Sequence, residues 1–504
     1  MGSSQSTPAN ITRGEKVLER LNAQQFNEKI KQADEDEYVQ IDATPSRYKG
    51  SETVSIATAE AWEKELLADP KNRLALSALL SNPVESIISQ KVATLADTQT
   101  FNIAIPFEGA PITNQRSSGR CWLFAATNTF RIAIMKKHNL KEFELSQAYL
   151  FFWDKLEKAN WFLEQIMETA DQDLDSRLIQ ELLTAPVNDG GQWDMVVNLV
   201  EKYGLVPQNL FPDSYNAMNS SAMGSILTKK LREDALILRA MSSSTKRTSK
   251  SSLLSAKAKM MQEIHCILTL MLGPPPKPDT KFSWEFYDAA GKYHDVSKTP
   301  LEFAKELSSP SLVRTLHADI STLFSLVNDP RNAYNRLLTV SRLGNVVGGR
   351  PITYVNVDMP TMKNAAISML KAGLPIFFGS DVGKFSNSTS GIMDLALYDY
   401  NLAFNISLGM NKAQRLRARD SAMTHAMVLT AVHVEDGKSV RWRVQNSWGE
   451  TSGEKGYFVM TDAWMDEYVY QVVVDPSYVS KEVRDVLSTT PLVLPLWDPM
   501  GALA

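Results

Sequence analysis

Gln115-Arg116-Ser117-Ser118-Gly119-Arg120-Cys121-Trp122 is the stretch that decides the fold. Directly after it the chain reads as a helix to about His138, because apolar residues recur at steps of three and four. Cys121 is therefore predicted to stand at a helix N-terminus, where unpaired backbone N–H groups and the positive end of the helix dipole favour a thiolate. Since the thiolate is the nucleophilic form of cysteine, this position indicates catalysis. The alternative is an ordinary buried cysteine.

Gln115 lies six residues before Cys121, across a predicted tight turn. At that spacing its side-chain amide can aim at the same point as the backbone N–H of Cys121. Two such donors would stabilise the negative oxygen that forms when a nucleophile attacks a carbonyl. We therefore interpret Gln115 as a candidate oxyanion donor.

Two further candidates come late in the chain. His425 enters an apolar, strand-like run, and a second alternating run ends at Asn446. The 21 residues between them are enough for two antiparallel strands and the turn at Glu435-Asp436-Gly437. Asn446 can accept a hydrogen bond from one imidazole nitrogen and so turn the other toward Cys121, while Trp448 can shield that bond from water. Cys121, His425 and Asn446 are the predicted catalytic residues.

A Gly-Gly pair follows at Gly190-Gly191. Glycines leave backbone N–H and C=O groups open to close approach by another chain. An ordinary loop is the alternative for this pair.

Composition narrows the function classes. The chain has 504 residues, 44% of them apolar, two cysteines and a formal charge of -4. So few cysteines indicate a reducing compartment, and the charge gives no general reason to bind nucleic acid. We see no secretory signal and no apolar run long enough to span a membrane. The motifs of zinc metalloproteases and serine hydrolases are absent, and the six histidines do not cluster, so we expect neither a metal nor a cofactor.

The rest of the chain divides by pattern. Residues 1–44 are predicted to be a flexible extension, with a weak myristoylation pattern at Gly2, and residues 45–105 an N-terminal arm with helices near 58–67 and 73–81. Long helices are predicted at 223–241 and 252–272, and another at 332–343, so we interpret residues 220–345 as a helical insertion. Cys266 is interpreted as a buried structural thiol.

Residues 118–122 resemble the active-site signature of papain-like cysteine proteases, with Ser118 in place of the first cysteine and Arg120 at a small position. Asn446-Ser447-Trp448-Gly449 resembles their asparagine segment. The chain from about residue 45 is similar to the bleomycin hydrolases, and this resemblance includes the tail Pro495–Ala504. This implies an α+β, papain-like fold: a helical half at 106–219, the insertion, a β-barrel-like half at 346–487, and a tail at 488–504 that enters the active-site cleft.

The resemblance also implies a function. It predicts an intracellular cysteine aminopeptidase acting on peptides, with bleomycin hydrolase and homocysteine-thiolactonase side activities, in which Gly190, Gly191 and Trp448 contact substrate. The carboxylate of Ala504 would pair with the substrate's α-ammonium. A homohexamer in the cytoplasm, and in mitochondria for some fungal members, is expected. DNA binding stays open, although the charge argues against it. The alternatives are an endopeptidase or transferase with the same triad, and a chaperone-like or nucleic-acid-binding ring.

Overall fold

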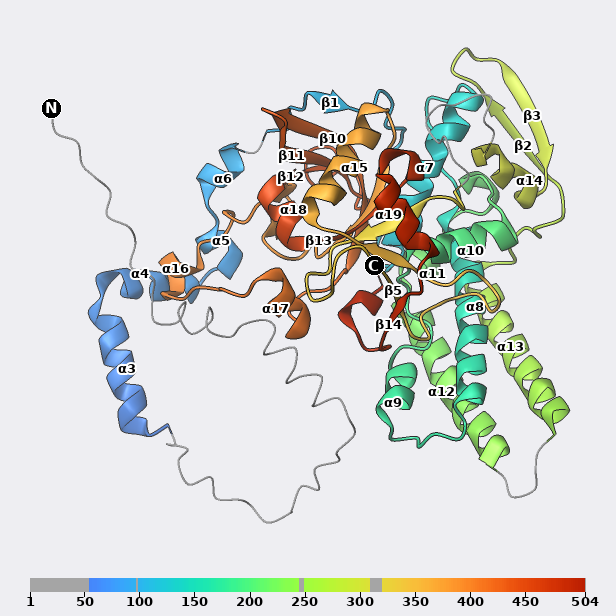
Figure 1. Cartoon of the computed structure of the whole chain (residues 1–504), viewed down its shortest axis with the longest axis horizontal. Coiled ribbons are helices and arrows are strands. Elements are labelled where there is room, and N and C mark those ends of the chain that lie inside the picture. The colour runs from blue at the N-terminus through green and yellow to red at the C-terminus, as the bar shows by residue number, and fades with distance from the viewer. Residues whose placement is uncertain (1–53, 97, 244–248, 309–319, 504) are drawn as a thin grey trace. The chain divides into compact units, whose positions relative to one another are not determined.

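The structure is a computed structural model that describes residues 54–96, 98–243, 249–308 and 320–503 (Figure 1). The chain divides into two units, Met1–Arg73 and Leu74–Ala504. In the first unit, helix α3 (Ile56–Ala68) begins after Ser55, whose hydroxyl accepts a hydrogen bond from the backbone N–H of Thr58 at 3.1 Å. Helix α4 (Pro70–Leu79) begins with a proline, which suits the first position of a helix. Both helices were predicted; the extension 1–44 with Gly2 lies outside the described residues.

The helical half of the second unit forms around α7 (Cys121–Lys137), which confirms the helix predicted from Cys121. Against it pack α8 (Gln147–Glu168) and α10 (Trp193–Tyr203). The aromatic side chains of α8 are nearly all buried. The other helical segments are α5 (Val84–Ile88), α6 (Lys91–Ala96), α9 (Arg177–Thr184), η1 (Gln208–Leu210), α11 (Tyr215–Met218), α12 (Ser221–Ser243) and α13 (Lys250–Leu272).

The β half is built on one mixed sheet. Its strand order is β14-β5-β6-β4-β13-β7-β10-β11-β12-β9-β8, with β1 also on β10. Strands β10 and β11 are the antiparallel pair predicted from the sequence, joined by the Asp436-Gly437 turn. The bounds are β1 (Ile103–Ala104), β4 (Phe324–Val327), β5 (Arg336–Val340), β6 (Tyr354–Asn356), β7 (Ile376–Ser380), β8 (Ser386–Asn387), β9 (Ile392–Met393), β10 (His425–Glu435), β11 (Lys438–Gln445), β12 (Tyr457–Thr461), β13 (Val469–Val474) and β14 (Leu492–Leu494).

Helices also accompany this sheet. Helix α15 packs against β13, β10 and β7, and α18 packs against β11 and β12. Their bounds, with those of the shorter helices, are α15 (Met359–Lys371), α16 (Tyr400–Phe404), α17 (Lys412–Arg417), α18 (Asp462–Tyr468), η3 (Pro476–Tyr478), α19 (Lys481–Asp485), η4 (Val486–Ser488) and η5 (Pro499–Gly501). The helical half meets the sheet where α7 packs against β10, so the first residues of α7 and β10 are brought together.

The region predicted as a helical insertion, residues 220–345, is only partly helical. Helices α12 and α13 are present and run beside α8 (Figure 1). After them come the hairpin of β2 (Phe282–Tyr287) and β3 (Tyr293–Lys298), then α14 (Pro300–Ala304) and η2 (Lys305–Ser308). Strands β4 and β5 follow and belong to the main sheet. The helix predicted at 332–343 is wrong. Part of this segment is strand β5, and its apolar residues are in the sheet because β5 pairs with β6 and β14.

Cys266 is exposed, so its interpretation as a buried thiol is wrong. The buried positions of α13 include Met260, Ile264 and Leu268, which recur every four residues. Cys266 falls two residues after Ile264 and therefore on the other side of the helix. Its apolar sequence neighbours misled the interpretation because adjacent residues on a helix do not share a face.

Candidate active site

Three predicted catalytic residues meet at the junction of the two halves. Cys121 is the first residue of α7, His425 the first residue of β10, and Asn446 directly follows β11. All three are buried, with exposed fractions of 2%, 4% and 1%. The backbone N–H of Ala426, next to His425, lies within hydrogen-bonding reach of the Cys121 thiol. The structure thus brings the Cys121 thiol to the residue that follows His425, from a segment about 300 residues away in sequence.

Asn446 orients the imidazole. Its Oδ1 lies 2.9 Å from Nε2 of His425 and also accepts the backbone N–H of Ser447 at 2.8 Å. Because this oxygen can only accept, Nε2 of His425 carries the hydrogen and Nδ1 is left to receive a proton. The Trp448 ring lies 4.8 Å from the imidazole, centre to centre, and covers this pair. This is the arrangement that the sequence predicted for these three residues.

Burial dominates the ionisation of the pair. It raises the pKa of the Cys121 thiol to about 11, although the backbone N–H groups of Ala426, Trp122 and Cys121 itself act in the opposite direction. It lowers the pKa of His425 to about 4, against the effect of the Asn446 hydrogen bond. A helix N-terminus is expected to lower the pKa of the Cys121 thiol, but burial outweighs this effect for a thiolate without a charged partner. Transfer of the thiol proton to His425 creates both charges together and leaves the net charge of the pocket unchanged.

Gln115 lies in the same site. Its backbone N–H donates to Ser447 O at 2.8 Å, and its Oε1 accepts from Ser447 Oγ at 2.7 Å. Its Nε2 donates one hydrogen to Ser118 O at 2.6 Å, which leaves the second hydrogen for another acceptor. Gln115 is thus fixed between the asparagine segment and the loop before Cys121.

Arg120 is a feature whose role sequence reasoning missed. Its side chain is fully buried and makes a two-pronged ion pair with Asp213, with N–O distances of 2.6 and 3.0 Å. Its Nε also donates to Ser118 Oγ at 2.9 Å. A buried guanidinium needs a carboxylate, so an arginine beside the nucleophile was a signal that such a partner exists. Asp213 is 93 residues away, and nothing in the local pattern identifies it.

The Gly190-Gly191 pair lies directly beside the nucleophile helix. A Cβ on Gly191 would stand 2.5 Å from the Trp122 ring, so only glycine fits there. The residue before the pair, Asp189, holds the Trp122 indole N–H with its backbone carbonyl at 2.7 Å. The structure therefore brings the predicted substrate-binding glycines next to Cys121.

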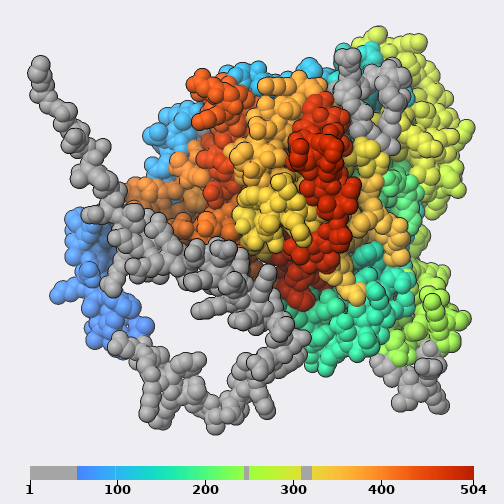
Figure 2. Space-filling view, viewed as in Figure 1, coloured from blue at the N-terminus to red at the C-terminus, as the bar shows by residue number. Residues whose placement is uncertain are grey.

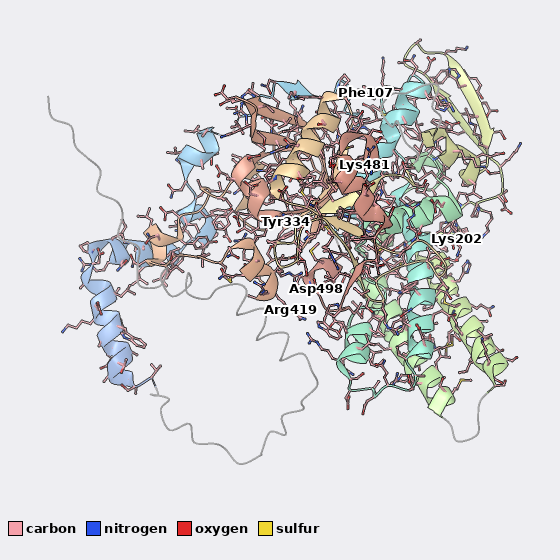
Figure 3. All side chains as sticks on the ribbon, in the orientation of Figure 1. Phe107, Lys202, Tyr334, Arg419, Lys481 and Asp498 are labelled. Atoms are coloured by element: carbon pink, nitrogen blue, oxygen red, sulfur yellow. The ribbon has the colours of Figure 1, made fainter. Side chains whose placement is uncertain are left out.

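The C-terminal tail is held along the protein surface rather than free. Figure 2 shows it as the red band that crosses one face, and β14 pairs with β5 in parallel. Asp498 forms an ion pair with Arg331 at 2.7 Å, and the Trp497 carbonyl accepts from Arg419 at 3.4 Å, the residue labelled beside Asp498 in Figure 3. The Trp497 ring lies 4.1 Å from the guanidinium of Arg177. These contacts anchor the tail on both halves of the unit.

The end of the tail reaches the Gly-Gly segment. Gln192, the residue after Gly191, donates from Nε2 to Ala502 O at 2.6 Å. Met500 is buried, and Leu503 packs against the same apolar core. Leu503 also lines a cavity of about 160 Å³ together with Lys158 and Asn188. Ala504, the predicted partner of the substrate's α-ammonium, lies outside the described residues.

Within the described ranges, no three His, Cys, Asp or Glu side chains are grouped so that they could hold a metal ion. Nor is any helix of these ranges long and apolar enough to cross a lipid bilayer.

A Cys-His-Asn set between a helical half and a β half defines a papain-like cysteine peptidase. The family model of the Peptidase C1-like family matches residues 53–501. Bleomycin hydrolase of Gallus gallus is 46% identical over 462 residues, covering 90% of this chain and 99% of the relative. Bleomycin hydrolase of Homo sapiens is 44% identical over 450 residues, covering 88% and 96%. "Cysteine proteinase 1, mitochondrial" of Saccharomyces cerevisiae is 43% identical over 462 residues, covering 90% and 94%.

A solved structure agrees with this assignment. The crystal structure of PepW from Lactobacillus rhamnosis HN001 superposes with a TM-score of 0.85 at 43% identity, covering 90% of this chain and all of that one. The chain belongs to the Peptidase C1-like family, and its α+β, papain-like fold is confirmed. The relatives support a cysteine aminopeptidase of the bleomycin hydrolase type.

Proposed function

We propose that the protein removes N-terminal residues from peptides through a thioester on Cys121. The observation that carries this proposal is the 2.9 Å bond between His425 and Asn446 beside the sulfur of Cys121. It leaves Nδ1 of His425 free to accept the proton of the Cys121 thiol, which stands at a helix start. General-base activation of a thiol by an oriented histidine is the common route to acyl transfer at such a site.

The steps follow from the geometry. Cys121 Sγ attacks the scissile carbonyl carbon while its proton passes to Nδ1 of His425. The Nε2 group of Gln115 and the backbone N–H of Cys121 hold the negative oxygen. The C–N bond then breaks, and His425 gives its proton to the leaving amine. Water attacks the thioester with His425 as base, which releases the acid and restores the thiol.

Specificity for free N-termini is assigned to the tail. The bond from Gln192 to the Ala502 carbonyl, next to the Gly190-Gly191 segment, supports this assignment. A terminal carboxylate on Ala504 would pair with the α-ammonium of a substrate, and the tail would stop longer chains from extending past it. The anchoring of Asp498 by Arg331 keeps the tail in this place.

The relatives and the resemblance extend the proposal to substrates, assembly and location. Two of the relatives are named bleomycin hydrolase, so we propose bleomycin as a side substrate. Homocysteine thiolactone is proposed as another. A homohexamer is proposed; light scattering should then give six times the 56.2 kDa of one chain. The cytoplasm is the proposed location. Mitochondria are proposed as a second location because the yeast relative is named a mitochondrial proteinase. DNA binding has no support in the overall charge of -4.

A time course on one unlabelled peptide with products identified by mass tests the proposed function. Aminopeptidase action should yield a ladder of products that shorten from the N-terminus by one residue at a time. An endopeptidase with the same catalytic residues would give internal fragments from the first minutes, which would overturn the proposal. Retention of DNA without any peptide turnover would favour the ring-shaped binding protein instead.

The pH dependence of Cys121 alkylation should show that the thiol and imidazole work as a pair. The reactive form has one proton shared between them. The pair gains a second proton only near the pKa of His425, about 4, and loses its remaining proton only near the pKa of Cys121, about 11. The rate with iodoacetamide should therefore be nearly flat from about pH 5.5 to about pH 9. In His425→Ala the rate should be far lower and rise with pH throughout. A wild-type rate that rises tenfold per unit would contradict the pairing.

A further inference from the structure

Asp189 joins two segments that the proposed mechanism needs in register. Its Oδ2 accepts the backbone N–H of Gly119 at 3.0 Å, two residues before the nucleophile. Its own backbone carbonyl holds the Trp122 indole N–H, and the next residue is Gly190. One residue thus touches the loop before Cys121, the first turn of α7 and the predicted substrate-binding segment.

The carboxylate of Asp189 is itself held by groups outside the catalytic set. Lys155 Nζ lies 2.6 Å from its Oδ1, and the Ser220 hydroxyl donates to its Oδ2. Burial alone would raise the pKa of Asp189. The Lys155 ammonium, aided by the hydrogen bonds from Ser220 and Gly119, outweighs burial and lowers the pKa to about 2. Asp189 therefore stays ionised throughout the pH range in which the catalytic pair is active.

The lysines of α8 hold the rest of this segment. The fully buried Lys155 also donates to Val187 O at 2.7 Å. One turn later, Lys158 donates to Gly190 O at 2.5 Å and to Asn188 O at 3.2 Å, and it pairs with the buried Asp154 at 2.7 Å. Two buried ammonium groups thus bind backbone carbonyls on both sides of Asp189. The ordering of the segment comes from charge-assisted hydrogen bonds to one rigid helix.

The fit between Asp189 and the nucleophile loop is tight. A Cβ on Gly119 would stand 2.7 Å from the Cβ of Asp189. Because Ser118 stands where the papain-like signature has a cysteine, no thiol of this loop other than Cys121 is present to form a covalent link. The loop and the Gly-Gly segment are tied together by the Asp189 carboxylate and by packing alone.

We propose that Asp189, fixed by Lys155, is a positioning residue that sets the register between the nucleophile loop and the substrate-binding Gly190-Gly191 segment. This rests on the proposed function, since it assigns the loop and the glycines to oxyanion and substrate binding. Asp189 does not touch the reacting atoms. It acts by fixing where the Gln115–Cys121 loop and the substrate backbone lie relative to each other, and a displacement of about 1 Å in such a register can cost on the order of 100-fold in rate.

The test compares Asp189→Asn, Gly119→Ala and the control Lys363→Met in the full-length enzyme. Asparagine keeps one acceptor oxygen, which can face either Lys155 or the Gly119 N–H and Ser220 hydroxyl, and its NH₂ group would face the donors on the other side. Alanine at 119 pushes Asp189 away without unpairing any charge, so it serves if Asp189→Asn fails to fold. Lys363 is also buried and paired, with Asp462 at 2.7 Å, but lies in the β half away from the site. Its loss reports the cost of a broken buried ion pair.

Two readouts separate positioning from a merely structural role. Sites are counted by stoichiometric alkylation of Cys121, and kcat and KM are expressed per intact site. Both site variants should lose about 100-fold in kcat/KM, with a fall in kcat, while the alkylation rate of Cys121 changes by less than about threefold. Lys363→Met should keep the wild-type kcat per site.

Either of two results would overturn the proposal: an unchanged kcat/KM per intact site in the variants that fold, or an equal loss in Lys363→Met. Failure of the proposed function looks different. In that case Cys121 alkylation would not abolish wild-type turnover, or the wild type would not cut from the N-terminus.

Discussion

Cys121→Ala should abolish peptide hydrolysis while the protein stays folded. The Cys121 thiol starts α7 within hydrogen-bonding reach of the Ala426 backbone N–H, and the neighbouring His425 is held by Asn446. Removal of a nucleophile that acts with a histidine costs on the order of 10⁶-fold in rate in the best-studied triads. We expect a loss of at least about 10⁴-fold, measured with a free peptide at saturating concentration.

The second cysteine provides the matched control. Cys266 is exposed on α13, in a part of the helical region away from the nucleophile helix start. Cys266→Ala should retain normal kcat and KM, and alkylation of this variant should still inactivate it. Near-normal turnover by folded Cys121→Ala would mean that another group carries the reaction, whereas a large loss in Cys266→Ala would give the exposed thiol a role that nothing in its surroundings explains.

Removal of residues 502–504 should change the enzyme's choice of substrate. This cut after Gly501 keeps the buried Met500 and the Asp498–Arg331 ion pair, and it removes the carbonyl that Gln192 holds. In the truncated enzyme the terminal carboxylate is on Gly501, three residues short of the position proposed to pair with an α-ammonium, and residues 502–504 no longer block a longer substrate. A charge-assisted hydrogen bond contributes about 1.5–3 kcal/mol, so the preference for free over acetylated N-termini should fall by about 10-fold to about 100-fold.

A milder variant checks that the position of the tail matters as well as its presence. Asp498→Ala breaks the tail's ion pair but leaves Arg331 bound to Asp329 at 2.9 Å. It should give an intermediate loss of preference. Asp485→Ala, which breaks the exposed pair with Lys481 on α19, is the control and should leave preference unchanged. If the truncated enzyme still requires a free N-terminus, another group recognises the α-ammonium and the tail has only a structural role.

Local patterns predicted the parts of the site that depend on neighbours in sequence. The helix from Cys121, the strand from His425 and the strand that ends before Asn446 follow from hydrophobic periodicity and turn residues, and the structure contains all three. Gly191 packs closely on Trp122, whereas the contact of the Gly190-Gly191 pair with a substrate stays a prediction. These elements could be predicted from the sequence because the local preference of each segment agrees with its tertiary packing.

The features that were missed join distant residues. Arg120 with Asp213 and Asp189 with Lys155 are ion pairs whose partners carry no mark in the local sequence. Strand β5 was predicted as a helix because its short apolar run does not reveal that β6 and β14 will pair with it. The expected low pKa of Cys121 ignored burial, which depends on the packing of α7 against β10 and not on the helix start alone.

The proposed thioester on Cys121 can be trapped and identified by mass. A slowly hydrolysed ester substrate is mixed with the enzyme, quenched in acid within the first turnover and digested with trypsin, which releases residues 121–131 as one peptide. The account predicts the mass of the acyl group on that peptide, in proportion to the product released in the burst, and its absence in Cys121→Ala. Turnover with no adduct on this peptide, or with the acyl group on the peptide that carries Cys266, would contradict it.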